Sequence, residues 1–118
     1  MKLSVIERMV VLNIFLPQKG KDLMESFRIN ELRKLLVIKS EELKGIEYKE
    51  TILDGQPRQN WNEDKDKSSE VDYSEIGVID IALFLEKLKE WEKKKEVPTD
   101  DITLELVKRF QAFGKEVK

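Results

Sequence analysis

The chain contains neither cysteine nor histidine. Without cysteine it has no disulfide, no thiolate metal site and no thiol nucleophile. Without histidine it lacks the commonest general base near neutral pH and the commonest ligand of transition metals. Catalytic triads and zinc hydrolysis in their usual forms are therefore excluded. Any catalysis would rest on carboxylates, lysine, tyrosine or serine.

Glycine and proline are also scarce, with five and three among 118 residues. Hydrophobic residues make up 40% of the chain and charged residues 39%, which is typical of a helix-rich globular protein with charged helix faces. This length suits one domain with one core. We therefore expect a single domain over 1–118.

Long hydrophobic runs are missing as well. The longest, "MVVLNIFL" at 9–16, is interrupted by Asn13 and is too short to cross a bilayer. Glu7 and Arg8 lie where a signal peptide would be apolar, and no small-residue cleavage site follows. These features predict a cytoplasmic protein without membrane contact.

Three helices are predicted in the N-terminal part. Ser4 stands three residues before Glu7, the spacing of a capping box, and opens a helix at 4–15 that Pro17 and Gly20 end. A second helix covers 22–38, and a short third one covers 40–45 with Ser40 as its cap. The apolar face predicted for the second helix consists of Leu23, Phe27, Leu32, Leu35 and Leu36.

The pattern changes at residue 46. Apolar and polar residues alternate in "IEYKETIL", "DGQP" is a turn signal, and "RQNWN" is extended again, so a β-hairpin is predicted. A third short strand is expected through Val71 and Tyr73, after a polar loop at 63–69. Two helices follow, the first apolar nearly all round from Ile76 to Leu85, and Gly114 is expected to end the second.

The predicted architecture is therefore α+β. It is a mostly helical single domain of about five helices, with a small antiparallel hairpin or three-stranded sheet in the middle. The expected parts are N-terminal helices at 4–44, a hairpin region at 46–73 and C-terminal helices at 74–114. The order helix, helix, short helix, hairpin is also that of a winged-helix domain.

Two acidic patterns in the sequence partly match known metal sites. "NWNEDKDK" offers oxygen ligands at alternate positions, but it lacks the glycine and the bidentate glutamate of a calcium loop. Glu47 and Lys49 have the acid-x-Lys spacing of magnesium-dependent nucleases, without an aspartate on a neighbouring predicted strand. Neither pattern supports a metal or another cofactor, and a metal-dependent hydrolase remains a weak alternative. Asp80, within "VIDIALF", is expected to pair with a cation from another helix.

A protein interface is the favoured kind of site. The end of the long helix and the last helix carry large apolar side chains, and the hairpin carries a tryptophan. We expect these side chains to form an apolar contact surface for a partner. The candidate interface residues are Trp91, Leu88, Phe110, Phe113 and Trp61.

Nucleic-acid binding in the winged-helix manner is the alternative. Its contacts would come from Arg28, Arg33, Lys34 and Lys39. However, residues 45–80 carry four basic and ten acidic side chains, and the helix that would enter the groove, "SEELKG", has two glutamates against one lysine. Phosphate repulsion argues against this use.

Several segments resemble small proteins encoded by phages and prophages of bacteria. They are "MKLSVIERMVVLNIFLPQKG", "LRKLLVIKSEELKGIEYKE" and "NWNEDKDKSSEVDYSE", followed by a long apolar helix and "DDITLELVKRF". Proteins of that family share an N-terminal segment like "ERLxLLNILP", an E-x-K strand and a "WN" pair. The resemblance implies a phage-related origin, hence a host cytoplasm, and assigns no role to any residue.

The function predicted from the sequence is non-enzymatic. We expect a protein that binds another protein or associates with itself, and that modulates a host system or serves as an accessory part of a virion. No small-molecule substrate is evident from the sequence.

Overall fold

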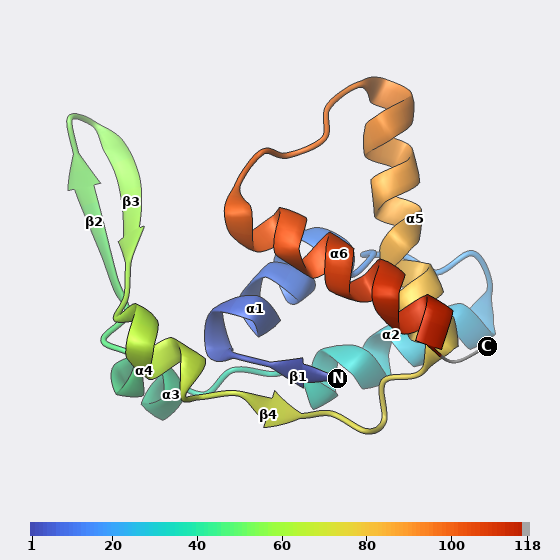
Figure 1. Ribbon diagram of the computed structural model, residues 1–118, viewed down its shortest axis with the longest axis horizontal. Coiled ribbons are helices and arrows are strands. Elements are labelled where there is room, and N and C mark those ends of the chain that lie inside the picture. The colour runs from blue at the N-terminus through green and yellow to red at the C-terminus, as the bar shows by residue number, and fades with distance from the viewer. Residues whose placement is uncertain (117–118) are drawn as a thin grey trace.

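The computed structural model describes residues 1–116, with side chains up to Phe113. In chain order the elements are β1 (Lys2–Leu3), α1 (Val5–Val10), the π-helical turn η1 (Val11–Phe15), α2 (Leu23–Leu35), α3 (Ser40–Gly45), β2 (Lys49–Leu53), β3 (Gln56–Asn60), α4 (Glu63–Lys67), β4 (Val71–Asp72), α5 (Val78–Lys94) and α6 (Asp101–Glu116). This mixed, mostly helical architecture confirms the predicted α+β class (Figure 1).

Local signals in the sequence place several of these elements. The predicted capping box is present: the Ser4 hydroxyl accepts the Glu7 amide, and the Glu7 carboxylate accepts the Ser4 amide at 2.9 Å. Asp22 caps α2 by accepting the Glu25 amide at 2.8 Å. Asp100 caps α6 by accepting the amide and the hydroxyl of Thr103.

The main core lies where η1, α2, α5 and α6 meet. Phe15 is the central side chain of this core: its ring packs edge-on against Trp91 at 5.5 Å and against Phe110 at 5.1 Å between centroids. Leu32 and Leu36 bring α2 to this core and have no exposed surface. The aromatic contacts join the first and last thirds of the chain.

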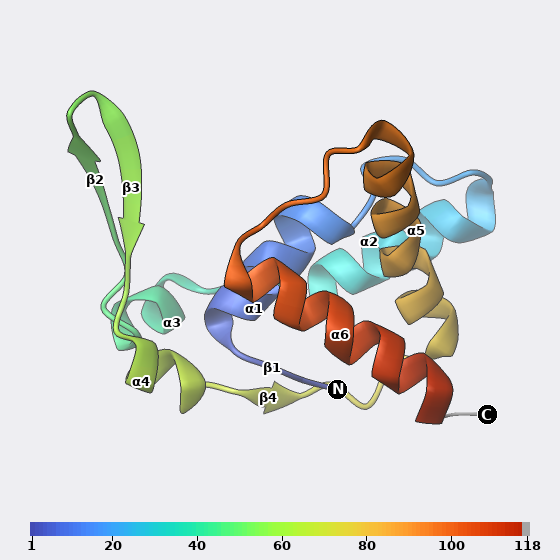
Figure 2. The same ribbon diagram turned by 45° about the horizontal axis from the view of Figure 1, so that its top comes forward.

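A smaller apolar cluster lies at the base of the hairpin. It consists of Val5, Ile6 and Ile46, with the half-buried Trp61 packed against it. Trp61, the residue directly after β3, therefore packs the base of the hairpin against α1. The hairpin itself extends away from the rest of the molecule in both views (Figures 1 and 2).

Two antiparallel pairs of strands are present within residues 1–116. The hairpin pairs β2 with β3, as predicted. The expected third strand forms as β4, but it pairs with β1 through Lys2 with Asp72 and Leu3 with Val71. The sequence order of a winged helix is therefore present, while the third strand lies beside the N-terminus instead of the hairpin.

Other predictions from the sequence were wrong. The expected loop at 63–69 contains α4, because the Asn62 side chain accepts the Lys65 amide and so begins a helix. Gly114 lies within α6 and does not end it. Ser40 was expected to cap the third helix, but it is the first helical residue and Lys39 is the N-cap. The Lys39 amide donates a hydrogen bond to the Glu42 carboxylate.

The predicted apolar face of α2 was also wrong in part. Leu32 and Leu36 are buried, but Leu23 and Phe27 are exposed, and Ile29 takes their place in the core. Among residues 1–116, no helix is both long and apolar enough to cross a membrane.

Candidate functional site

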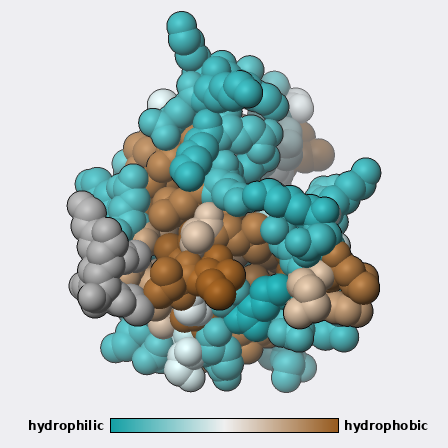
Figure 3. Space-filling model, turned by 90° about the vertical axis from the view of Figure 1, so that its right-hand side faces the viewer, coloured by the Kyte–Doolittle hydropathy of each residue, from teal (hydrophilic) through white to brown (hydrophobic). Residues whose placement is uncertain are grey.

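An apolar surface spans the first half of α2 and the first turns of α5. Its apolar side chains are Met24, Val78, Ile79, Ala82 and the largely buried Leu83, and we call it the α2–α5 face. Ile79 is 84% exposed and Met24 is 76% exposed, unusually high values for large apolar side chains. Figure 3 shows brown side chains gathered in the middle of this side of the molecule, with teal ones around them. Contiguous exposed apolar patches are typical of interaction sites in other proteins.

The α2–α5 face is concave. A hollow of about 850 Å³ lies between the two helices, lined by Met24 from α2 and by Val78, Ile79 and Ala82 from α5. Its lining is mainly apolar, and it is open to solvent along one side. A hollow of this shape can take apolar side chains projecting from another chain.

An ion pair holds the two helices in this arrangement. Arg28 on α2 donates from Nε to Oδ1 of Asp80 at 2.7 Å and from Nη2 to Oδ2 at 2.6 Å. Nη2 also donates to the carbonyl of Glu75 at 2.9 Å, while Asp80 accepts the Gly77 amide at 3.0 Å. This confirms the expectation that Asp80 pairs with a cation from another helix. The charges of Arg28 and Asp80 are therefore both used in contacts that join α2 to the start of α5.

The pKa of Asp80 reflects these contacts. Burial by itself raises the pKa of its carboxyl, but the hydrogen bonds from Arg28 and from the Gly77 amide outweigh burial. The pKa consequently lies below the ordinary value of an aspartate, so Asp80 stays ionised at neutral pH. It is not a carboxylate poised for proton transfer.

The rim of the hollow is acidic. Glu25, Glu75 and Glu86 surround it, and Lys21 pairs with Glu86 at 2.8 Å. Glu25 and Glu75 have no ion-pair partner among residues 1–113. Because Arg28 and Asp80 neutralise each other, the rim keeps two uncompensated negative charges. These charges favour a cationic ligand at its edge.

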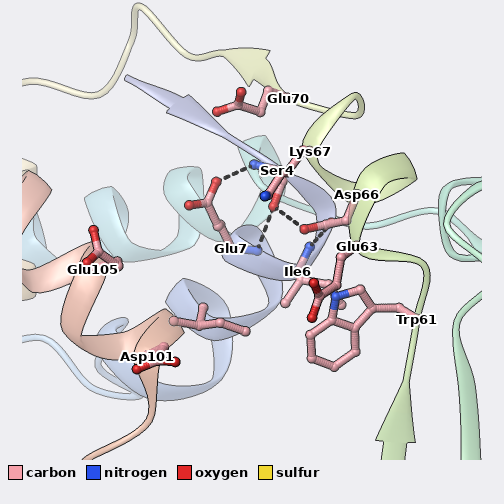
Figure 4. Close-up of a pocket in the computed structure, with 11 residues that line it drawn as sticks. Ser4, Ile6, Glu7, Trp61, Glu63, Asp66, Lys67, Glu70, Asp101 and Glu105 are labelled. Atoms are coloured by element: carbon pink, nitrogen blue, oxygen red, sulfur yellow. Dashed lines mark hydrogen bonds between the residues drawn. The ribbon is translucent and has the colours of Figure 1, made fainter.

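A second, smaller hollow of about 280 Å³ lies between α1, α4 and α6. Trp61, Ile6 and Ile102 form its apolar walls, and carboxylates surround it (Figure 4). Asp66 at its edge is buried and accepts from the Ser4 hydroxyl at 2.8 Å and from the Ile6 amide at 2.9 Å. This carboxylate therefore joins α4 to α1 and is not free to bind a ligand.

Two of the predicted interface residues are buried. Trp91 is 9% exposed and Phe110 is fully buried, so neither presents a surface to a partner, contrary to the prediction. Leu88 and Phe113 are half-buried and pack against the main core. Trp61 is also half-buried, so part of its indole remains accessible.

The side chains proposed for nucleic-acid contact do not form one free surface. Arg28 is engaged with Asp80 and Glu31, and Arg33 donates to the carbonyl of Pro17 at 3.1 Å. Lys34 and Lys39 are exposed. Two of the four proposed side chains, Arg28 and Arg33, are thus engaged in contacts within the protein.

The metal alternative finds little support in the geometry. Within the described residues there is no group of three metal-ligating side chains that could hold an ion. Glu47 pairs with Lys65 at 2.7 Å, and that contact lowers the pKa of the Glu47 carboxyl. Lys49 begins β2 and is exposed.

The sequence reasoning missed the α2–α5 face, although a signal was present. The helix α2 has more apolar residues than one face can hold. Ile29 and Leu32 face the core, whereas Leu23, Met24 and Phe27 are exposed. In α5 the apolar residues continue nearly all round the helix. Because only one face of a helix packs against the core, some of these apolar side chains must remain exposed.

Comparisons with protein-family models, with curated proteins and with solved structures found no match to this chain. The resemblance to phage-encoded proteins stays a prediction.

Proposed function

We propose that this protein is a non-enzymatic binding protein that holds a helical segment of another protein against the α2–α5 face. The single observation that carries the proposal is the apolar hollow there, with Met24 and Ile79 largely exposed. Burying one such side chain in an interface contributes about 1.5–3 kcal/mol. Amphipathic helices commonly bind in grooves of this type.

The acidic rim specifies the chemistry of the partner. Glu25 and Glu75 lie beside apolar side chains, so a helix with an apolar stripe flanked by lysine or arginine fits both features. A second copy of this chain fits poorly here, because two acidic rims would face each other. The proposed ligand is therefore a basic amphipathic helix of another protein.

The groups available for catalysis support a non-enzymatic role. Asp66, Asp80 and Glu42 are each engaged by hydrogen bonds that join separate elements. A hydrolase would need carboxylates that converge on a substrate.

The proposal is tested with two labelled helical peptides of about five turns. One carries a leucine stripe flanked by lysines, and the other carries the same stripe flanked by glutamates. We expect fluorescence anisotropy to show that the lysine peptide binds and the glutamate peptide does not. The affinity for the lysine peptide should fall as the salt concentration rises. Ile79→Ser is expected to lower the affinity about tenfold or more.

Ile52→Ser is the matched control, because Ile52 is also an isoleucine with 79% of its surface exposed, but it lies on the hairpin. It should leave peptide binding unchanged. No binding of the lysine peptide, or an equal loss in both serine variants, would contradict the proposal.

A further inference from the structure

The hairpin of β2 and β3 presents its backbone to solvent. All ten of its strand residues are exposed, and the two strands extend away from the helices (Figure 2). An isolated two-stranded hairpin is at best marginally stable in water, and an unpaired edge is a template for another strand. The apolar side chains of Ile52 and Leu53 are exposed near its tip.

The turn determines which backbone groups face outward. Asp54 and Gly55 form a two-residue turn with φ of 53° and 75°, the geometry of a type I′ hairpin. The flanking residues Leu53 and Gln56 are therefore a hydrogen-bonded pair, and such pairs alternate with non-hydrogen-bonded ones along the hairpin. The non-hydrogen-bonded pairs are Ile52 with Pro57 and Glu50 with Gln59. Their backbone N–H and C=O groups point away from the hairpin, toward its two edges.

The two edges are not equivalent. On β3 one of the outward positions is Pro57, which has no N–H to donate to a further strand. On β2 both outward positions, Glu50 and Ile52, carry an N–H and a C=O. The edge of β2 is therefore open to pairing, and the edge of β3 is blocked in part.

We propose that the open edge of β2 binds β2 of a second copy of this chain, in an antiparallel arrangement centred on Thr51. In this register Glu50 of each strand lies opposite Ile52 of the other. Each of these two pairs can exchange two hydrogen bonds, so every outward group on both strands at these positions is satisfied. The product is a four-stranded sheet made from two hairpins.

The strand itself favours a second copy as its partner. Its outward groups are placed symmetrically about Thr51, so two identical strands match without a shift in register. The hairpin also carries balanced charge, with Lys49 and Arg58 against Glu50 and Asp54. Self-association here therefore meets no net repulsion, in contrast to the acidic α2–α5 face.

Cysteine variants test the register directly, because the chain has no cysteine of its own. Thr51 would lie opposite its own copy as a non-hydrogen-bonded pair, with Cα atoms about 4.5 Å apart, within the range for a disulfide. Thr51→Cys should therefore form a disulfide-linked dimer under mild oxidation. Arg58→Cys is the matched control, since Arg58 is exposed and pairs with Thr51 inside the hairpin. It should stay largely unlinked, and equal crosslinking of both variants would overturn the register.

Proline variants test the edge. Glu50 and Gln59 face each other across the hairpin, and the N–H of each points outward, so proline at either position keeps the hydrogen bonds inside the hairpin. Sedimentation velocity from about 1 µM to about 1 mM should show a dimer in the wild type and in Gln59→Pro. Glu50→Pro should be monomeric, whereas Glu50→Gln, which keeps the N–H, should remain dimeric.

Three results would overturn the proposal. They are a wild type that is monomeric throughout this range, a dimer that survives Glu50→Pro, and an equal loss of dimer in both proline variants. This inference does not depend on the proposed function. Glu50→Pro should leave binding of the lysine peptide intact, and Ile79→Ser should leave the dimer intact, so the two proposals fail separately.

Discussion

Asp66 on α4 accepts a hydrogen bond from the hydroxyl of Ser4 at 2.8 Å, across 62 residues of sequence. Its other carboxylate oxygen accepts the Ile6 amide at 2.9 Å, and the Ser69 hydroxyl accepts the Val5 amide at 3.1 Å. Together with Ser4, these side chains satisfy the first three amides of α1, which have no partner inside the helix. The segment around α4 therefore completes the N-terminal cap of α1.

Removing the Asp66 carboxylate should destabilise the protein. Asp66→Ala leaves the Ile6 amide and the Ser4 hydroxyl buried without their partner, which costs about 2–3 kcal/mol. Asp64→Ala is the control, because Asp64 lies on the same helix with an exposed side chain, and it should change the free energy of unfolding by less than about 0.5 kcal/mol. Urea unfolding measures both values, and similar losses in the two variants would contradict the role of Asp66.

Acid should weaken the link between α2 and α5. The pKa of Asp80 in the folded protein lies below its ordinary value, as does that of Glu42, which is hydrogen-bonded to Arg8. Both carboxylates therefore stabilise the folded state at pH values above their ordinary pKa, and that contribution is lost as pH falls through the folded pKa. We expect the free energy of unfolding to fall as the pH drops below about 4.

The contribution of Asp80 can be separated from the rest of this pH dependence. Asp80→Asn removes the titrating group, so the free energy of unfolding should depend less steeply on acidic pH than in the wild type. Glu31→Gln alters an exposed partner of Arg28 and should keep the wild-type slope. An unchanged slope in Asp80→Asn would show that the ion pair with Arg28 does not contribute.

Gly20 should tolerate no side chain. A Cβ atom at this position would lie 2.4 Å from the backbone nitrogen of Ser26, closer than real contacts allow. Gly20→Ala must therefore shift the first turn of α2, with an expected loss of about 1–3 kcal/mol. Gly45→Ala meets no atom within 4 Å and should be neutral or stabilising. Thermal unfolding compares the two, and an unaffected Gly20→Ala would show that the loop yields without cost.

The two tryptophans should differ in their access to solvent. Trp91 is buried against Phe15, whereas Trp61 is half-buried beside the smaller hollow. In Trp61→Phe the remaining indole should therefore emit at shorter wavelength and resist quenching by acrylamide. In Trp91→Phe the remaining indole should be quenched more readily. Equal quenching in the two variants would contradict this placement.

Features that depend on near neighbours in the chain could be predicted from the sequence. The capping box of Ser4 and Glu7 and the turn at Asp54 and Gly55 each involve groups at most three residues apart. Their geometry follows from local hydrogen bonding and from the left-handed conformation that glycine adopts easily. The expected hairpin and the order of the helices followed from such signals.

The location of the α2–α5 face depended on contacts between distant segments of the chain. The sequence could not show which apolar residues of α2 face the core, because that choice depends on how η1, α5 and α6 fill the space around Ile29 and Leu32. The remaining apolar residues of α2, among them Met24, became the exposed surface.

The sequence by itself determined the fold class and the capping box of the first helix. It also excluded chemistry that needs cysteine or histidine. Only the tertiary structure decided that Asp66 on α4 caps α1, that β4 pairs with β1, and that Trp91 is buried. The reason is physical. Hydrogen bonds such as that between Asp66 and Ser4 join groups far apart in the chain, and no local pattern specifies which distant partner a carboxylate or an apolar side chain will meet.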